Sequence, residues 1–268
     1  EAAAGGDLPV GDMGSGSDYT PFVQHLGIAS MNIGYGGEGQ SGGVYHSAYD
    51  TFEHFERFGD PGFIYGVTLA KTGGRLMLRM ADAEILPFQF GDVAASLAEE
   101  SAQLKKLATT SREKSQATDR ALEARAFALA ADPTLPWGPP EREEAAPAID
   151  FSSLDAAIAA LGKSARAYDL AATTATPDAG RLARVNVILQ GAEQSLTDPR
   201  GLPGRPWYRH LIYAPGLLTG YGAKTLPGVR EAIESRRWSE VPEYMDRTAA
   251  VVRALSAKID EATALLSR

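Results

Sequence analysis

Cysteine is absent from the sequence of 268 residues. Disulfides, thiolate catalysis and cysteine-ligated zinc sites are therefore excluded within it. The chain also lacks any apolar run near the roughly twenty residues that cross a bilayer, so we expect no membrane segment in it. Histidine is scarce, with four residues, and no two of them stand four residues apart as in an HExxH helix.

Positive charge is in deficit. Lysine and arginine number 26 against 34 aspartates and glutamates, which gives a net charge of −8 and a pI of about 5.1. No basic face is available to neutralise phosphates, so we expect no nucleic-acid partner. The hydrophobic content of 44% is normal for a globular protein, and the length suits one large domain or two ordinary ones.

The first residues, EAAAGGDLPVGDMGSGSDY, do not form a signal peptide. They contain neither an initiator methionine nor a basic stretch followed by an apolar one. We expect the chain to be a fragment or a processed product.

The first third mixes helix and strand signals, and a change of composition near Leu86-Pro87-Phe88 suggests a domain boundary. We expect these elements, in order: a short helix at 22–26 capped by Ser17-Asp18 and ended by Gly27, a buried strand at 28–35, a glycine-rich loop at 36–43, a helix at about 48–58, and a helix that Asp60-Pro61 begins and that runs toward Ala83.

The remainder carries four apolar stripes with helical spacing, at 93–107, 151–172, 182–196 and 245–266. Each stripe must be buried against another helix, so four of them predict a helical bundle. Proline-rich residues 132–147 exclude a helix between the first two. Residues 198–228 form a second irregular stretch, whose length, aromatic residues and arginines suggest an ordered, functional segment.

His46 stands in the stretch GVYHSAYD (43–50), close to Asp50 and Glu53. Imidazole is the commonest zinc ligand, but a zinc site needs three or four ligands. On spacing alone an ordinary buried histidine is the better interpretation, and a metal ligand is the alternative.

Five separated stretches carry a family resemblance. They are GSGSDYTPFVQHLGIAS (14–30), YHSAYDTFEHFERFGDP (45–61), LPF (86–88), GLPGRPWYRHLIYAPG (201–216) and LPGVREAI (226–233). In this order they resemble the C-terminal part of a glutamate carboxypeptidase II-like protein, of the M28 zinc peptidase family that also gave rise to the transferrin receptor. The resemblance extends from Pro9 onward.

The resemblance implies a fold with two parts. Residues 1–88 resemble the C-terminal segment of an α/β zinc-dependent exopeptidase domain. Residues 89–268 resemble the all-α helical-bundle dimerisation domain of the transferrin receptor. The chain would then be predominantly helical and would form a homodimer through its helical domain.

The resemblance also reverses the interpretation of His46, because active members use the histidine of this YHS motif to bind one of two zinc ions. The remaining ligands and the general base lie upstream in the family, so it implies no catalytic residue in this chain. Asp50, Glu53 and Asp60 are not assigned to the metals and are expected to cap or line helices. One zinc ligand cannot assemble the site, so we expect the chain by itself not to hydrolyse peptides.

Five further residues match substrate-binding positions of the family. Tyr45 and Tyr221 correspond to tyrosines that hold the free α-carboxylate of the peptide substrate, and Ser15, Gly16 and Ser17 correspond to a backbone segment that lines the cleft. Phenol hydroxyls and backbone N–H groups are suitable donors to a carboxylate.

Three positions depart from the glutamate-preferring members. Gly220 replaces a lysine that pairs with the glutamate side chain, and Asn32 and Gly34 replace two arginines. Without these cations the electrostatic reason for acidic selectivity is lost. We therefore expect a relaxed or more apolar peptide preference, and both carboxypeptidase and aminopeptidase activity stay possible.

The alternative is a non-catalytic, transferrin-receptor-like homodimer, or a dimerisation module alone. The intact YHS motif favours the peptidase, because a receptor-like relative would be free to lose His46. Relatives are mostly extracellular, vacuolar or periplasmic, so we expect an extracellular or periplasmic protein whose anchor or signal would lie upstream.

Overall fold

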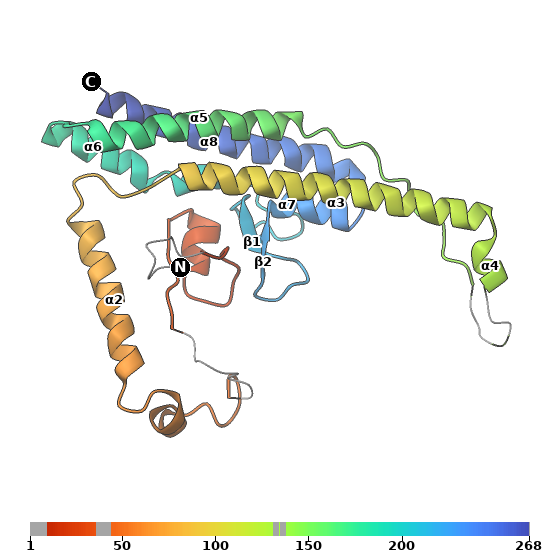
Figure 1. Ribbon diagram of the computed structural model, residues 1–268, viewed down its shortest axis with the longest axis horizontal. Coiled ribbons are helices and arrows are strands. Elements are labelled where there is room, and N and C mark those ends of the chain that lie inside the picture. Colours follow the sequence, from red (N-terminus) through yellow and green to blue (C-terminus); the bar gives the residue numbers. More distant parts are fainter. Residues whose placement is uncertain (1–9, 36–43, 131–133, 135–137, 268) are drawn as a thin grey trace, which may run out of the picture. The chain divides into compact units, whose positions relative to one another are not determined.

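The computed structural model describes residues 10–35, 44–130, 134 and 138–267. They fall into two compact units. The larger unit, called here the helical unit, comprises residues 10–30 and 88–267, and the smaller unit comprises the described residues between 31 and 87. The chain is predominantly helical, as predicted (Figure 1). The division of the chain at residue 88 into two family domains stays a prediction.

The smaller unit contains α1 (Phe52–His54), the short π-helix Phe55–Gly59 and α2 (Ile64–Ala81). The helical unit contains the π-helix Pro21–Leu26, α3 (Gly91–Glu123), α4 (Ala126–Ala130), α5 (Ser152–Thr174), α6 (Ala179–Gln190), the 3₁₀ turn Glu193–Leu196, β1 (Tyr213–Pro215), β2 (Ala223–Thr225), α7 (Pro227–Glu234), the 3₁₀ turn Trp238–Glu240 and α8 (Val241–Leu266).

The four predicted bundle helices are confirmed as α3, α5, α6 and α8, but α6 ends at Gln190, so the last positions of its predicted stripe, Ala192 and Leu196, lie beyond the helix. In Figure 1, α5 lies along α8, while α3 packs beside α5 and α6 covers α8. The residues of the predicted apolar stripes are largely buried, among them Leu154, Leu161 and Tyr168 on α5 and Val252 and Ile259 on α8. Each fully buried leucine or valine contributes about 2 kcal/mol through removal of its side chain from water.

The helix α3 is much longer than its apolar stripe. Its buried apolar residues, Ala94, Leu97 and Leu104, all lie in the first half. Its C-terminal turns run past the ends of α5 and α8 in Figure 1. The described residues of the following proline-rich stretch contain no helix, as predicted, and Arg142 bonds back to Asp119 and Glu123 on α3 at 3.3 and 3.1 Å.

The stretch 198–228 is more regular than its sequence suggests. β1 and β2 form an antiparallel hairpin in which Tyr213 pairs with Thr225 and Pro215 with Ala223. Strands of three residues are too short to show an alternating pattern, so the sequence did not reveal them. The helix α7 follows the hairpin and is largely buried against α8.

The predicted strand at 28–35 is wrong. These described residues belong to no strand, and Ile28, Met31 and Tyr35 are exposed. A strand requires a neighbour for its backbone hydrogen bonds, which an apolar pattern alone cannot supply. The preceding short helix does end at Gly27, in the left-handed conformation, but Thr20 rather than Ser17-Asp18 stands at its N-cap.

In the smaller unit the first helix begins later than predicted. Thr51 caps α1 by accepting the N–H of His54 at 3.2 Å, so residues 48–51 are not helical. Asp60 caps α2, as expected, although it stands four residues before the first helical residue. Its carboxylate accepts the N–H groups of Tyr65 (3.1 Å) and Gly66 (2.8 Å). The helix therefore begins at Ile64 and not at Pro61.

The helix α2 buries none of its residues. Several large apolar side chains of this unit are exposed, namely Phe52, Phe58, Ile64, Tyr65, Met77 and Leu78. A unit that leaves so much apolar surface in water gains little stability from its own packing.

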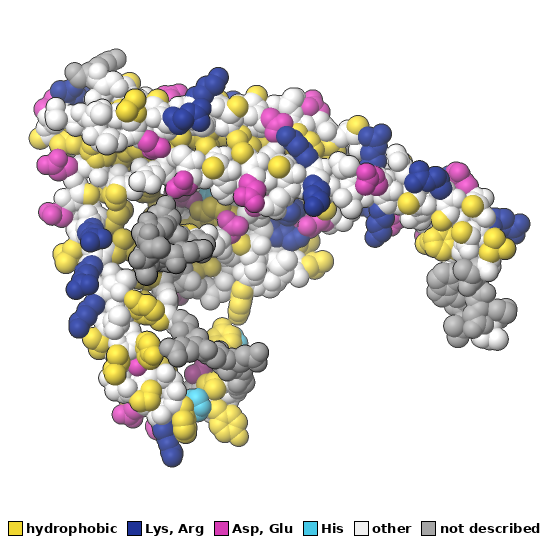
Figure 2. Space-filling model, viewed as in Figure 1, with side chains coloured by type: hydrophobic (Ala, Val, Ile, Leu, Met, Phe, Trp, Pro, Cys, Tyr) yellow, Lys and Arg dark blue, Asp and Glu magenta, His cyan; other side chains and the backbone are white. Residues whose placement is uncertain are grey.

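The surface carries charges of both signs. On the face that Figure 2 shows, lysine and arginine side chains alternate with aspartate and glutamate along the bundle helices. Among the helices within the described ranges, none combines the length and the hydropathy needed to cross a membrane.

Replacing Leu161 with alanine tests the bundle core. The side chain is fully buried on α5, so we expect Leu161→Ala to lower the free energy of unfolding by about 2–5 kcal/mol. Lys163→Ala on the same helix is the control, because that lysine is exposed and its loss should cost less than about 0.5 kcal/mol. Urea unfolding followed by circular dichroism measures both. Equal effects would mean that α5 packs with another face.

Candidate functional site

Two of the predicted substrate-binding segments meet in the helical unit. The backbone N–H of Ser15 donates to the carbonyl of Tyr221 at 3.0 Å. Gly16 has a φ of +86°, and a Cβ placed on it would lie 2.6 Å from Cδ1 of the Tyr221 ring. A Cβ on Gly14 would lie 1.8 Å from the Tyr221 carbonyl oxygen. Glycine is therefore required at positions 14 and 16 for the tyrosine to pack on this backbone.

Tyr221 remains open to a ligand. Its side chain is 58% exposed, and within the described residues its hydroxyl makes no hydrogen bond. Ser17 is exposed and Ser15 is half-buried. Together the phenol, the two serine hydroxyls and the local N–H groups offer hydrogen-bond donors that a carboxylate could accept.

The segment before Ser15 is held by Gln24, which the sequence did not single out. Its fully buried amide nitrogen donates to the carbonyls of Met13, at 2.9 Å, and of Gly14. The backbone carbonyl of Gln24 in turn accepts the N–H groups of Arg209 and His210 at 2.7 and 3.2 Å. The short helix Pro21–Leu26 thus ties the segment around Gly16 to the stretch that leads into β1.

His210 is the buried histidine of the described chain. Its Nε2 lies 2.9 Å from Oε1 of Glu193, and the hydroxyl of Tyr213 donates to the same oxygen at 2.7 Å. Burial, followed by the negative charge of Glu193, raises the pKa of Tyr213. This cluster joins the 3₁₀ turn after α6 to β1 and has a structural role.

His46 is exposed, so its interpretation as an ordinary buried histidine is wrong. It has a φ of 60°, which is unusual for a residue with a Cβ, and its ring stacks on that of Tyr45 at 3.7 Å between centroids. Strained backbone of this kind is concentrated at functional sites. Tyr45 is also exposed, and both residues belong to the smaller unit.

The fit of His46 to zinc is that of a single ligand. Its exposed imidazole can offer a ring nitrogen to a metal. Within the part of the chain that the structure describes, no group of three or more histidine, cysteine, aspartate or glutamate side chains could hold a metal ion. These residues can therefore supply one bond of a zinc site but not the site.

The three positions that lack the family's cations are accessible. Gly220 has a φ of +60°, and a Cβ placed on it meets no atom within 4 Å. Asn32 and Gly34 are exposed in the smaller unit. A longer side chain at position 220 would have room, although any Cβ there would carry backbone strain.

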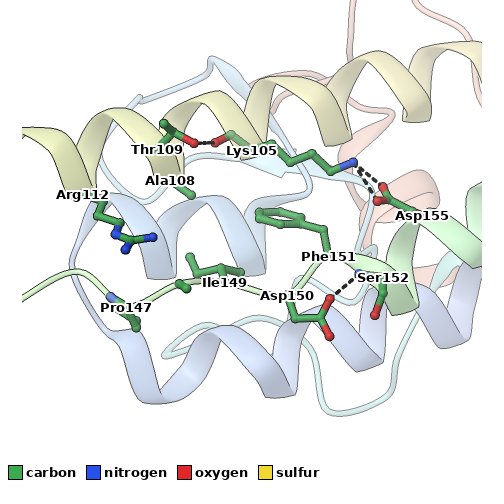
Figure 3. Close-up of a pocket in the computed structure, with 11 residues that line it drawn as sticks. Lys105, Ala108, Thr109, Arg112, Pro147, Ile149, Asp150, Phe151, Ser152 and Asp155 are labelled. Carbon is green, nitrogen blue, oxygen red and sulfur yellow. Dashed lines mark hydrogen bonds and ion pairs between the residues drawn. The ribbon is translucent and has the colours of Figure 1, made fainter.

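A cavity of about 460 Å³ lies elsewhere in the helical unit, between α3 and the start of α5 (Figure 3). Its charged residues serve the fold, since Lys105 binds both carboxylate oxygens of Asp155 at 2.7–2.8 Å and Asp150 accepts the N–H of Ser152 at 2.9 Å. None of the predicted site residues lines this cavity.

Comparisons with known proteins agree with the family resemblance. Residues 149–260 match the model of the transferrin receptor-like dimerisation domain. A probable glutamate carboxypeptidase of Arabidopsis thaliana is 32% identical over 250 residues, and one of Arthroderma benhamiae is 32% identical over the same length. An aminopeptidase of Rattus norvegicus is 29% identical over 252 residues.

These alignments cover 91%, 91% and 92% of this chain, but only 31%, 29% and 29% of the respective relatives. The chain thus spans less than a third of the length of the curated relatives it matches. The resemblance to glutamate carboxypeptidase II-like proteins is confirmed.

Replacing Gly16 with alanine tests the packing of Tyr221. An added Cβ would meet the tyrosine ring and would sit at a positive φ, so we expect Gly16→Ala to cost at least about 1 kcal/mol of unfolding free energy. Gly11→Ala is the control, because its Cβ meets nothing within 4 Å and should change stability by less than about 0.5 kcal/mol. Urea unfolding distinguishes them, and a neutral Gly16→Ala would contradict the contact.

Proposed function

This chain carries the transferrin receptor-like dimerisation domain in a sequence similar to glutamate carboxypeptidases, and on that premise we propose that it is the C-terminal part of a dizinc exopeptidase. The observation that carries the proposal is the contact of Tyr221 with Ser15 and Gly16. These segments lie far apart in the sequence, and the resemblance independently assigns both to the substrate cleft.

His46 is the residue of this chain that would hold zinc. Two bridged zinc ions supply a hydroxide nucleophile and polarise the scissile carbonyl when they are bound. The other ligands and the general base would come from the preceding part of the peptidase domain. The strained backbone at His46 and its stacking on Tyr45 support this role, because they fix the direction of the imidazole ring.

The remaining site residues would bind the substrate. Tyr221, Ser15 and Ser17 would donate hydrogen bonds to the carboxylate of a peptide. Gly16 has no Cβ and therefore leaves room for the ring of Tyr221. Tyr45 would add a second phenol beside His46. Because glycine and asparagine occupy the positions of the family's cations, we propose a relaxed, non-glutamate preference.

A homodimer through the helical domain is part of the proposal. The match to the dimerisation-domain family supports it. So do Leu170 on α5 and Val187 on α6, which are 67% and 68% exposed, although most of the other large apolar side chains of these helices are buried.

Removing the imidazole of His46 tests the zinc role. In the full-length parent, His46→Ala should abolish chelator-sensitive peptide hydrolysis, because a zinc ion that loses one ligand is no longer held in the geometry of the site. The dimer should persist in size-exclusion chromatography with light scattering. His54→Ala is the control, since His54 lies in the same unit on α1 and should be dispensable for activity.

Two results would contradict the proposal. Retained hydrolysis in His46→Ala would remove this residue from the metal site, and loss of the dimer would make it structural. A wild-type parent with no hydrolytic activity but a stable dimer would instead favour the non-catalytic, receptor-like alternative.

Introducing a cation at Gly220 tests the substrate preference. Gly220→Lys should raise the ratio of kcat/KM for peptides ending in an acidic residue over apolar ones by about tenfold, because the ammonium group would pair with the acidic side chain. Gly220→Ala is the matched control, because it carries the same backbone strain without the charge. An unchanged ratio in Gly220→Lys would place the loop of Tyr221 outside the pocket.

A further inference from the structure

We infer that Glu231 is a positioning residue, which with Arg205 fixes the loop that presents Tyr221. The inference rests on the proposed substrate-binding role of Tyr221. Glu231 itself is buried on α7 and acts through the loop backbone.

The loop 216–222, between β1 and β2, needs an anchor. It is closed by its own hydrogen bonds, such as that from the N–H of Gly216 to the carbonyl of Gly222 at 3.1 Å. Its large side chains do not hold it, since Leu217, Leu218 and Tyr221 are 56%, 92% and 58% exposed. A loop without buried side chains stays ordered only if polar contacts compensate the entropy lost on fixing its backbone.

Glu231 supplies such a contact. Its Oε1 accepts the backbone N–H of Leu217 at 2.7 Å, directly after the loop leaves β1. The guanidinium of Arg205 binds both carboxylate oxygens of Glu231 at 2.7 Å, and its other terminal nitrogen donates to the carbonyl of Pro215. Carboxylate and guanidinium thus grip the chain on either side of Gly216.

The ion pair between Arg205 and Glu231 is buried. The side chains of Arg205 and Glu231 are 13% and 6% exposed, so water does not screen them strongly. A single guanidinium nitrogen, Nη2, donates to both carboxylate oxygens, and a hydrogen bond between charged groups is stronger than one between neutral groups. If one partner loses its charge, the other is left in a poorly hydrated place without compensation.

Arg205 is itself held in place by the turn from which it projects. Gly201 directly before this turn and Gly204 within it have positive φ values, and a Cβ on Gly201 would lie 2.3 Å from the carbonyl oxygen of Pro206. The guanidinium lies over the ring of Tyr208 at 5.6 Å. The turn and the tyrosine ring thus restrict the position of the guanidinium independently of Glu231.

The consequence reaches the candidate substrate residues through the backbone. Tyr221 is four residues beyond Leu217 in the same closed loop, and its carbonyl and ring bind Ser15 and Gly16. Displacement of the loop at Leu217 would therefore move the ring of Tyr221 away from Gly16. A positioning role predicts weaker substrate binding with little effect on the chemical step.

The experiment uses the full-length parent and three variants. Glu231→Gln keeps the size of the side chain and removes its charge, so the ion pair with Arg205 is lost. Tyr221→Phe removes the proposed donor directly. Asp155→Asn is the matched control, because Asp155 also binds a cation, Lys105, with both oxygens, but does so between α3 and α5.

Two readouts are measured for each protein. The first is the rate of chymotrypsin cleavage after Leu217, Leu218 and Tyr221, mapped by mass spectrometry. The second is KM and kcat for a peptide with a free C-terminal carboxylate. We expect Glu231→Gln to raise the rate of loop cleavage about tenfold and to raise KM about tenfold. The kcat should change less than about threefold. Asp155→Asn should leave both readouts at the wild-type values.

Each outcome decides between the claims. If Tyr221→Phe raises KM while Glu231→Gln changes neither loop cleavage nor KM, the inference on Glu231 fails and the proposed function stands. If Tyr221→Phe leaves KM unchanged, the substrate role of Tyr221 fails, and the inference fails with it. If Glu231→Gln lowers kcat and KM stays constant, Glu231 is not a positioning residue. Restoration of KM by Glu231→Asp would support the need for a charge.

Discussion

The packing of α5 against α8 is the constraint on which the helical unit depends. Both helices bury a continuous apolar face, and α3, α6 and α7 complete the unit by covering what this pair leaves open. The hairpin and its loop have no apolar core of their own, since each strand is three residues long. Polar contacts with the bundle therefore hold the hairpin and its loop in position.

Arg247 provides one such link. It lies on α8, is 6% exposed, and donates to Asp198 at 2.8 Å and to the carbonyl of Gly201 at 2.6 Å. Burial alone would raise the pKa of the Asp198 carboxyl, but hydrogen bonds from Arg200 and Arg247 lower it to about 2. The aspartate therefore stays charged at neutral pH and holds the start of the turn that carries Arg205. Two buried ion pairs, Arg247–Asp198 and Arg205–Glu231, are thus joined by the backbone between Asp198 and Arg205.

The smaller unit, in contrast to the helical unit, leaves most of its apolar side chains exposed. It contains the exposed Tyr45 and His46, one left-handed histidine backbone and a helix α2 without a buried residue. Asp60 organises it locally, as a buried cap of α2, and not through a core. In the proposed peptidase, its apolar side chains would pack on the preceding part of that domain, and the geometry of His46 would be completed there.

The sequence by itself determined the bundle. Its four stripes fell on α3, α5, α6 and α8, because a period near 3.6 residues reports burial of one helix face and needs no knowledge of the partner. Gly27 and Asp60 were also readable, since caps act on the nearest turns. The partners of a chain segment were not readable in this way. Residues 28–35 have a strand-like pattern, but a pattern cannot create the neighbour that a strand requires.

Only the tertiary structure decided which distant residues meet. The contact of Tyr221 with Gly16, the tie made by Gln24, and the grip of Glu231 and Arg205 on the hairpin all join segments separated by long stretches of chain. Local periodicity carries no information about such pairs, because they depend on the path of the loops through space. Family resemblance named Tyr221 and Ser15–Ser17 from their motifs, but the buried charges that hold them in place became visible only once the bundle had brought those loops together.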